Sequence, residues 1–418
     1  MLSDIVGRAA ADGDRLRVVG AGHSFTPIAA GGDVMISLDE LTGIVAVDEP
    51  RRRVRFHAGT RLRDIPALLE PFGLALANQG DVNPQSLAGA ISTSTHGTGL
   101  GFTGFAGTVT GLTLMGPDGG VRDLSADSAP EIFDLARVSL GVLGVVTEVE
   151  LQCVSAFDLI AEERVVGFAE VLDELVDRMR AADHFEFYWF PHTDTALTKT
   201  NTRVAPGEPG PGHLAAAKMR NRWINLLDKE IVENQALRLA VELGARVPAV
   251  VPAINRTAQA LVSDRMYRAA GHDVFVTARR VRFNEMEYAL PLTAGTEAIG
   301  EIREAIEARG WSISFPIEVR CAAADDVPLS TATGRETMYI AVHRFIKEDF
   351  DEYFRVVETI LRRHGGRPHW GKIHTLAADE LRELYPRFDD FCALRARLDP
   401  EAMFGNRYTD SLFGLSRR

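Results

Sequence analysis

A glycine-rich turn with one histidine at its tip is the part of the chain whose chemistry is easiest to name. The run Gly20-Ala-Gly-His-Ser24 follows a short apolar stretch, Leu16–Val19, that predicts a strand. Glycines after a strand let backbone amides approach a phosphate closely. A dinucleotide fingerprint of the nicotinamide type would need a third glycine, but Phe25 stands there and Pro27 follows. The turn therefore predicts a phosphate loop of another kind.

Three further segments concentrate polar groups. Residues 78–99 are dense in Gly, Ser and Thr and could wrap a polyphosphate through amides and hydroxyls. Phe315–Arg320 has the pattern of a strand, on which Glu318 and Arg320 point to the same face. The loop Gly365–Lys372 collects cationic donors. These segments could hold a phosphate-containing cofactor and a substrate with ionisable or hydroxyl groups.

Composition limits the class of protein. The chain has 418 residues, 46% hydrophobic, which is enough for two or three domains with real cores. Its formal charge of −12 without a basic cluster makes nucleic acid an unexpected partner. Cys153, Cys321 and Cys392 lie far apart, so we expect no disulfide framework and no metal site. With no signal peptide and no apolar stretch that could span a membrane, we expect a cytoplasmic protein.

The elements that must position these residues fall into two groups. In the first group we predict helices at Leu2–Ala11, Leu62–Pro71 and Ala129–Leu140, with short strands between them. The predicted strands of this group are Leu16–Val19, Val34–Leu38, Ile44–Asp48, Arg53–Ala58, Val109–Met115 and Gly144–Gln152.

Strand candidates rich in aromatic and β-branched residues fill the middle of the chain, which predicts an antiparallel sheet. These candidates are His184–Phe190, Val274–Arg282, Glu285–Leu290, Ile313–Arg320 and Thr337–Arg344. The pattern predicts helices at 214–261, with breaks at Gly244, Pro248 and Pro252, and at Phe350–His364, Ala377–Tyr385 and Phe388–Arg397.

Seven motifs in order resemble flavoproteins of the vanillyl-alcohol oxidase type, specifically the aldonolactone oxidoreductases, a group related to the alditol oxidases. The motifs are Val19-Gly-Ala-Gly-His-Ser24, Ser86–Ala90 with Thr95-His-Gly-Thr-Gly99, Ser139–Glu148, Glu186-Phe-Tyr-Trp-Phe-Pro191, Glu285-Met-Glu-Tyr-Ala289, Phe315–Arg320 and Arg367-Pro-His-Trp-Gly-Lys372. Each motif alone is weakly specific, but the ordered set covers nearly the whole chain.

The resemblance implies an α+β fold, with a two-subdomain FAD-binding domain of the PCMH type and an antiparallel-sheet substrate (cap) domain. It divides the chain into residues 1–152 for the FAD-binding part, 153–365 for the cap, and 366–418 for a segment that completes the FAD site and active site.

The same resemblance assigns the cofactor contacts. His23 falls where family oxidases bond a histidine covalently to the flavin; the alternative is an ordinary loop histidine beside the pyrophosphate. His96 has no evident chemical role and is expected to be structural, while Val146 would face the adenine or ribitol side or simply pack in the core. The expected cofactor-binding residues are Gly20, Ala21, Gly22, His23, Ser24, Gly80, Ser86, Gly89, Ser92, Thr95, His96, Gly97, Gly99, Val146 and Lys372.

The resemblance also implies catalytic roles. Arg320 would polarise the substrate oxygen and, with Lys372, stabilise negative charge on the reduced flavin; Glu318 would accept a hydrogen bond from the substrate hydroxyl. His369 either takes the substrate proton or orients its loop. Glu318 and Arg320 could instead be a surface ion pair along a strand.

Gly80 aligns with a position where glycine leaves space for dioxygen and alanine tends to block it. Asp81 stands where alditol oxidases have a serine, and Ala341 and His343 stand where they have histidine and threonine. These departures favour lactones over open-chain alditols, with Asp81, Glu318, Arg320 and His343 expected to bind the substrate. An ordinary half-buried strand histidine is the alternative for His343.

We therefore expect an FAD enzyme that oxidises a secondary hydroxyl of an aldono-1,4-lactone of the L-gulono or D-arabinono type, with dioxygen or another acceptor reoxidising the flavin. One alternative is an alditol oxidase that produces hydrogen peroxide. Another is a non-catalytic flavin-binding module, suggested by Met1 falling inside the first helix, where relatives have a preceding strand. Either the start is assigned late or a strand is missing, and a missing strand would expose a sheet edge.

Overall fold

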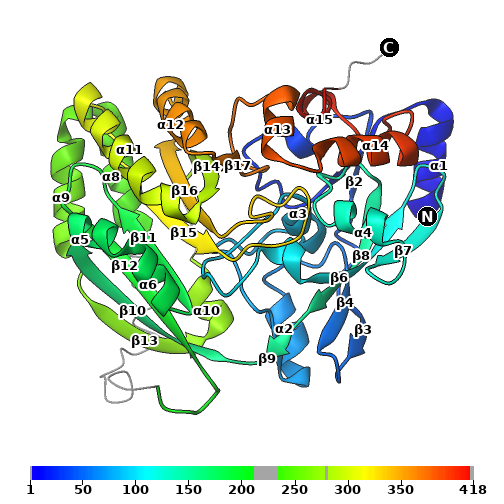
Figure 1. Cartoon of the computed structure of the whole chain (residues 1–418), viewed down its shortest axis with the longest axis horizontal. Helices are drawn as coiled ribbons and strands as arrows, with labels where there is room; N and C mark the ends of the chain where they lie inside the picture. Colours follow the sequence, from blue (N-terminus) through cyan, green and yellow to red (C-terminus); the bar gives the residue numbers. More distant parts are fainter. Residues whose placement is uncertain (1, 211–233, 278–280, 415–418) are drawn as a thin grey trace.

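The computed structural model describes residues 2–210, 234–277 and 281–414. Two sheets of different size stand side by side along the long axis of the molecule (Figure 1). The larger sheet is built from the middle of the chain, and the smaller one from the first 152 residues. Among the described residues, no helix is both long enough and apolar enough to cross a membrane.

The larger sheet has eight strands in the order β13-β10-β12-β11-β15-β16-β14-β17, and all its pairings are antiparallel. The strands are β10 (Asp158–Gly167), β11 (His184–Trp189), β12 (Thr195–Val204), β13 (Arg265–Ala270), β14 (Phe283–Pro291), β15 (Ile317–Ala322), β16 (Thr337–Phe345) and β17 (Arg367–Pro368). Strand order does not follow chain order, so residues more than 100 positions apart become neighbours.

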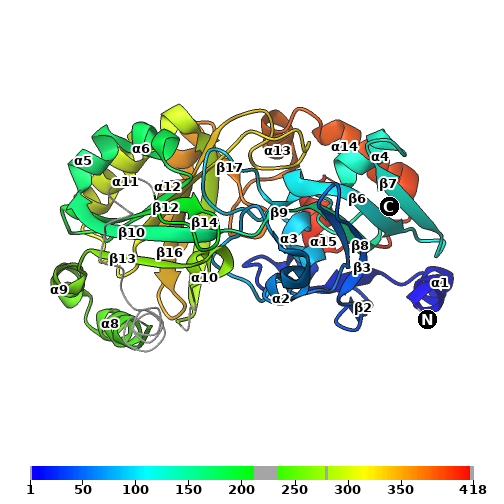
Figure 2. The same ribbon diagram turned by 90° about the horizontal axis from the view of Figure 1, so that it is seen from below.

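The two faces of this sheet differ in chemistry because side chains alternate along each strand. One face is apolar and includes the buried residues Phe187, Val319 and Ile340. Helices α5 (Phe168–Asp173), α6 (Leu175–Ala181), α11 (Gly295–Arg309) and α12 (Asp351–Arg363) cover that face together (Figure 2). The hydrophobic effect therefore fixes which way the alternate residues point.

The opposite face is polar although it is also buried. Its charged or ionisable members are Glu163, Lys199, Glu186, Tyr188, Glu318, Arg320, His343, Glu285 and Glu287. Cross-strand partners in the register lie on the same face, which brings Tyr188 opposite Glu318 and Glu285 opposite His343. This face, called the polar face below, looks away from the four covering helices.

The smaller sheet has five strands in the order β3-β4-β8-β6-β7. These are β3 (Ile44–Asp48), β4 (Arg53–His57), β6 (Val109–Met115), β7 (Val121–Ser125) and β8 (Val145–Gln152). Beside it, β1 (Leu16–Val19) and β2 (Val34–Ser37) form a parallel pair, and β5 (Leu74–Ala75) pairs with β9 (Val154–Ser155). Helices on this side are α1 (Leu2–Asp12), α2 (Ile65–Leu69), α3 (Leu87–Ser92) and α4 (Pro130–Ala136).

The two ends of the chain pack together. Helices α13 (Ala378–Leu384), α14 (Phe388–Leu398) and α15 (Arg407–Leu412) lie against the amino-terminal part (Figure 1). Leu16 N donates to Met403 O at 2.8 Å, and Asn406 Nδ2 donates to the carbonyl oxygen of Ala30 at 2.7 Å. Buried Arg17 donates to Leu140 O and, from its other Nη atom, to Gly141 O, both at 3.0 Å. The carboxyl-terminal segment thus completes the amino-terminal domain.

Most predicted elements are present, with exceptions. The predicted strand 274–282 is wrong where it is described: α10 (Gly271–Phe275) ends inside it, and residues 278–280 lie outside the described residues. Of the predicted helical stretch 214–261, α8 (Asn234–Arg246) and α9 (Val251–Leu261) are confirmed, while 214–233 lie outside the described residues. The break at Pro248 is confirmed, but those at Gly244 and Pro252 are wrong, because α8 continues to Arg246 and Pro252 lies in the first turn of α9. Strands β7, β10, β12 and β13 were not predicted, because their many polar residues hide the period-2 pattern.

Candidate active site

A cavity of about 410 Å³ opens beneath the glycine-rich turn that follows β1. It is lined by nine of the expected cofactor-binding residues, which are Gly20, Ala21, Gly22, His23, Ser24, Ser86, Gly89, Ser92 and Val146. A Cβ added at Gly20 would lie 2.6 Å from Ser86 Oγ, and Gly22 has a φ of +69°. Both positions need glycine, because one approaches a neighbouring loop closely and the other is left-handed.

His23 is solvent-accessible at this cavity. Partial desolvation lowers the pKa of His23, and the positive charges of Lys372 and Arg61 lower it further. The imidazole is therefore held in the neutral state over a wider pH range than a free histidine. A neutral imidazole nitrogen has a lone pair, which both a covalent bond to carbon and an accepted hydrogen bond require.

Residues 95–99 at the end of the 78–99 segment do not line this cavity, contrary to the expectation that they wrap the same phosphate. Gly99 N donates to Cys321 O at 2.8 Å, and Thr98 Oγ1 donates to Phe185 O. These bonds place Thr95, His96, Gly97 and Gly99 between the two sheets. Backbone pairing with β15 explains the placement, because it ties the segment to the edge of the site rather than to the turn at Gly22.

Glu318 and Arg320 lie together on the polar face, 4% and 7% exposed. Arg320 Nη2 forms an ion pair with Glu318. Tyr188 Oη donates a hydrogen bond of 3.1 Å to Glu318 Oε1. Asp81 Oδ1 lies 3.4 Å from the Arg320 guanidinium, so the loop after β5 and the larger sheet meet here. The surface ion pair considered from the sequence is excluded by this burial.

Arg320 has a third carboxylate partner that the sequence argument missed. Arg320 Nε donates to Glu186 Oε2 at 3.0 Å, and Lys199 Nζ lies 3.4 Å from Glu186 Oε1. Burial lowers the pKa of Arg320, but the charges of Glu318, Asp81 and Glu186 outweigh it and leave the pKa well above its ordinary value. The signal available in the sequence was one glutamate inside the aromatic run Phe185–Trp189.

Lys372 also has a carboxylate partner. Its ammonium group forms an ion pair with Glu285 and lies 4.9 Å from the centre of the Phe25 ring. Phe25 N donates to Gly371 O at 2.7 Å, so the loop containing Lys372 is attached to the chain just after the glycine-rich turn. Lys372 therefore connects the turn to the polar face.

His343 lies behind Glu285 on the polar face and is 2% exposed. Its Nδ1 lies 3.1 Å from Pro316 O, its Nε2 lies 3.5 Å from Glu285 Oε1, and its ring contacts Phe283 and Phe315. These contacts give His343 the surroundings of a structural histidine. Ala341, two residues before it on β16, is the cross-strand partner of Glu318, so His343 lies on the same face as Glu318.

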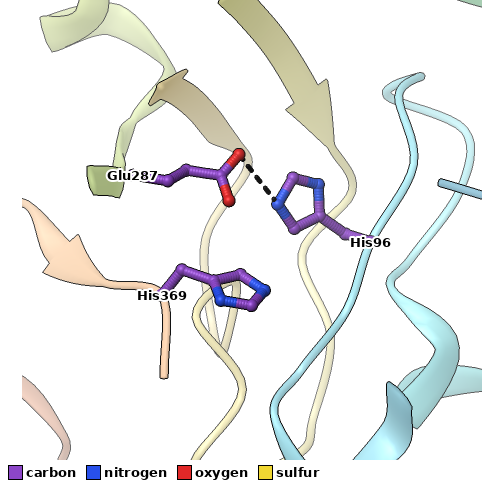
Figure 3. Close-up of side chains that lie close together, drawn as sticks. All are labelled: His96, Glu287 and His369. Atoms are coloured by element: carbon purple, nitrogen blue, oxygen red, sulfur yellow. Dashed lines mark ion pairs between the residues drawn. The ribbon is translucent and has the colours of Figure 1, made fainter. Parts of the chain in front are cut away.

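A compact buried group is formed by His96, Glu287 and His369, which come from three separate segments and point toward one another (Figure 3). His96 Nε2 lies 3.4 Å from Glu287 Oε1, and the His96 ring stacks on Tyr339 at 3.4 Å between centroids. Burial raises the pKa of Glu287, but the nearby His96 and His369 outweigh it and bring the pKa down to about 2. Glu287 is therefore ionised.

His369 has one ring nitrogen fully engaged. Gly371 N donates to His369 Nδ1 at 3.1 Å, so the neutral ring carries its hydrogen on Nε2. Burial lowers the pKa of His369 to about 3. In this tautomer neither nitrogen has a free lone pair, which disfavours both metal ligation and proton acceptance. The geometry favours the loop-orienting role over the proton-accepting one.

Gly80 packs closely against this buried group. An added Cβ would lie 2.9 Å from His96 O, a backbone atom, and 3.9 Å from Thr95 Cγ2. Glycine at this position is thus required by the approach of one loop segment to another, in addition to any role in admitting dioxygen.

Comparison with known proteins gives a consistent result. A model of the D-arabinono-1,4-lactone oxidase family matches residues 149–412, and a model of an FAD-binding domain matches residues 1–125. L-gulono-1,4-lactone dehydrogenase of Mycobacterium tuberculosis is 42% identical over 414 residues, which cover 99% of this chain and 94% of that protein. L-gulonolactone oxidase of Mus musculus is 31% identical, covering 98% and 92%.

The fold is also found in solved structures. Cholesterol oxidase from B. sterolicum superimposes with a TM-score of 0.81 at 17% identity, covering 99% of this chain and 92% of that one. At this identity the likeness concerns the fold alone. The expected α+β fold, an FAD-binding domain joined to a domain with an antiparallel sheet, is thereby confirmed.

Proposed function

Because the chain belongs to the D-arabinono-1,4-lactone oxidase family, we propose that it is an FAD-dependent oxidoreductase acting on a secondary hydroxyl of an aldono-1,4-lactone. The names of its relatives support L-gulono- and D-arabinono-1,4-lactone as the substrate class. The chemistry that FAD supplies when bound is acceptance of a hydride at flavin N5 and return of the electrons to dioxygen or another acceptor. The three cysteines are unpaired, which suits a reducing compartment such as the cytoplasm.

The residues around the 410 Å³ cavity fit such a cofactor. Gly20–Ser24 would hold the pyrophosphate through backbone amides, with Ser86, Gly89 and Ser92 on the facing loop. Gly20 supports this because any side chain there would meet Ser86 Oγ and fill the space between the two loops. Val146 would pack against the adenine or ribitol side. His23 would be the point of covalent attachment, supported by its accessibility and its lowered pKa.

Glu318 is the residue we propose to accept the hydroxyl proton. Its carboxylate is buried, and the hydrogen bond from Tyr188 Oη together with the ion pair to Arg320 fixes its orientation. The engaged Nδ1 of His369 supports assigning proton acceptance to Glu318 rather than to His369. Arg320 would polarise the substrate oxygen, and Lys372 would contribute positive charge near the turn that holds the cofactor.

The observation that carries the proposal is the position of the Glu318–Arg320 pair on the polar face, in contact with Asp81 from the loop of the FAD-binding domain. A substrate held there would lie between the two domains. The resemblance places Asp81 where alditol oxidases have a serine, and this departure supports a lactone over an open-chain polyol.

The test is anaerobic reduction of the purified yellow protein. L-gulono-1,4-lactone should bleach the flavin absorbance, whereas xylitol should not, and hydrogen peroxide formed on admitting air identifies dioxygen as the acceptor. Bleaching by xylitol alone would favour the alditol oxidase. A protein that binds FAD but is bleached by no lactone or alditol would contradict the enzyme and favour a flavin-binding module.

A further inference from the structure

We propose that Glu186, supported by Lys199, is a positioning residue that fixes the guanidinium plane of Arg320 in the active site. The inference rests on the proposed function for its catalytic consequence, but the geometry that suggests it does not depend on the substrate. Neither Glu186 nor Lys199 was among the site residues expected from the sequence.

Arg320 is held by a contact at its Nε atom. This atom donates to Glu186 Oε2 at 3.0 Å, while the Nη atoms face Glu318 and Asp81. A guanidinium is planar with its donors in a fixed fork, so holding Nε also sets the direction of both Nη groups. Glu186 therefore determines which edge of Arg320 faces Glu318 and the substrate.

Glu186 is itself anchored by Lys199. Its other oxygen, Oε1, lies 3.4 Å from Lys199 Nζ, which in turn donates to Val274 O at 2.9 Å. Glu186 and Lys199 are directly opposite each other in the register of β11 and β12, and each is 6% exposed. A buried carboxylate between two cations cannot easily change rotamer, because any other position would leave a buried charge unpaired.

Arg320 faces three carboxylates, from Glu318, Asp81 and Glu186, and Lys199 supplies a second positive charge to this group. Burial raises the pKa of Glu186, but the charges of Lys199 and Arg320 outweigh it, so the pKa lies below its ordinary value. Glu186 therefore stays ionised and keeps the negative charge that holds Arg320 Nε.

Tyr188 lies two residues after Glu186 on the same strand, and its hydroxyl donates a hydrogen bond to Glu318. Strand β11 thus contacts both residues of the Glu318–Arg320 pair: Glu186 accepts from Arg320, whereas Tyr188 Oη donates to Glu318. This one strand therefore holds both residues of the pair.

The experiment uses the full-length holoenzyme and the substitutions Glu186→Gln and Glu186→Gln/Lys199→Met. The double variant removes one charge of each sign, so it remains foldable if Lys199 alone cannot stay buried. We expect the limiting rate of anaerobic flavin reduction by L-gulono-1,4-lactone to fall about 10–100-fold in both, in keeping with the cost of a misplaced group. The half-saturating lactone concentration should change by less than about threefold, since Glu186 does not touch the substrate under this proposal.

A second readout does not depend on turnover. The Arg320 Nε–H resonance, assigned by its loss in Arg320→Lys, should exchange slowly with solvent in the wild type and at least about tenfold faster in both variants. Glu358→Gln is the matched control: this carboxylate is 3% exposed, accepts from Thr375 N at 2.8 Å, and belongs to α12 on the apolar side of the same sheet. Its reduction rate and the Arg320 exchange should stay at wild-type values.

Recovery of the wild-type rate in the double variant would show that Glu186 only balances Lys199, and would overturn the proposal. Unchanged Nε–H exchange in Glu186→Gln would overturn it as well. If the wild-type protein is not reduced by any lactone, the proposed function fails, while the exchange measurement still decides whether Glu186 fixes Arg320.

Discussion

Arg320 and Glu318 form a buried ion pair between residues two positions apart on a single strand. Because Asp81 and Glu186 also contact the guanidinium, Arg320 faces more negative charge than it carries. An arginine expected to stabilise an anionic flavin thus also holds three carboxylates in place. Its loss should affect the orientation of Glu318 as much as the local charge.

Replacing Arg320 with alanine should slow anaerobic flavin reduction by about 10²–10³-fold, because it removes a charged donor and leaves Glu318 without its partner. Stopped-flow absorbance of the flavin measures this rate. Arg265→Ala is the control, since Arg265 pairs with Glu163 toward the other edge of the same sheet, and its rate should stay within about twofold of wild type. A near-normal rate in Arg320→Ala would remove this residue from the active site.

Gly80→Ala should slow reoxidation of the reduced flavin by dioxygen about tenfold or more while leaving anaerobic reduction nearly unchanged. The new methyl group would meet His96 O at 2.9 Å, so the loop must shift as well, and we expect a lower melting temperature. Gly101→Ala is the matched control in the following loop, because an added Cβ there meets nothing within 4 Å. Equal oxygen reactivity in wild type and Gly80→Ala would contradict the gating role.

Covalent attachment through His23 predicts that acid precipitation of the wild-type protein leaves the yellow colour in the pellet. The variant His23→Ala should release it to the supernatant. The pKa of His23 is lowered by desolvation and by Lys372 and Arg61, so the reactive neutral ring dominates at pH 7. Attachment of FAD to apoprotein should accordingly slow only when the pH falls through this lowered pKa. Yellow supernatant from the wild type would exclude the bond.

Stability should fall as the pH drops below about 6.5, the ordinary pKa of histidine. Burial lowers the pKa of His184 to about 3, of His369 to about 3 and of His374 to about 4. These rings are neutral in the folded protein but take up protons in the unfolded chain, so unfolding binds protons below pH 6.5. Each contributes a slope of up to about 1.4 kcal/mol per pH unit down to its folded pKa.

The measurement is the urea midpoint at pH 7 and pH 5, a window above the ordinary pKa of glutamate. Burial raises the pKa of Asp325 to about 6, so the folded protein binds one proton there within this window, which offsets the effect of one of the three histidines. His184→Gln should flatten the dependence, because one proton fewer is bound on unfolding. His272→Gln is the control, because the His272 side chain is 46% exposed and loses little hydration on folding. This variant should leave the pH dependence of the midpoint unchanged. Identical midpoints at the two pH values would contradict the assignment of buried neutral histidines.

The sequence by itself determined the features that are local. Alternation along Ile317–Ala322 placed Glu318 and Arg320 on one face, and the glycines of Gly20–Ser24 indicated a turn that lets backbone approach a ligand. Both conclusions depend only on neighbouring residues and on the two-residue repeat of a strand. The ordered motifs added the fold, which the comparisons confirm.

Tertiary structure alone decided the partners. Glu186 meets Arg320, Glu285 meets Lys372, and Glu287 meets His96, all across more than 80 positions of sequence. The register of the eight-stranded sheet sets which face Glu186, Glu285 and Glu287 occupy, and a one-residue slip would turn them to the other face. Tertiary structure also separated residues 95–99 from the cavity at Gly22, because a backbone hydrogen bond from Gly99 N to Cys321 O holds that segment against the larger sheet.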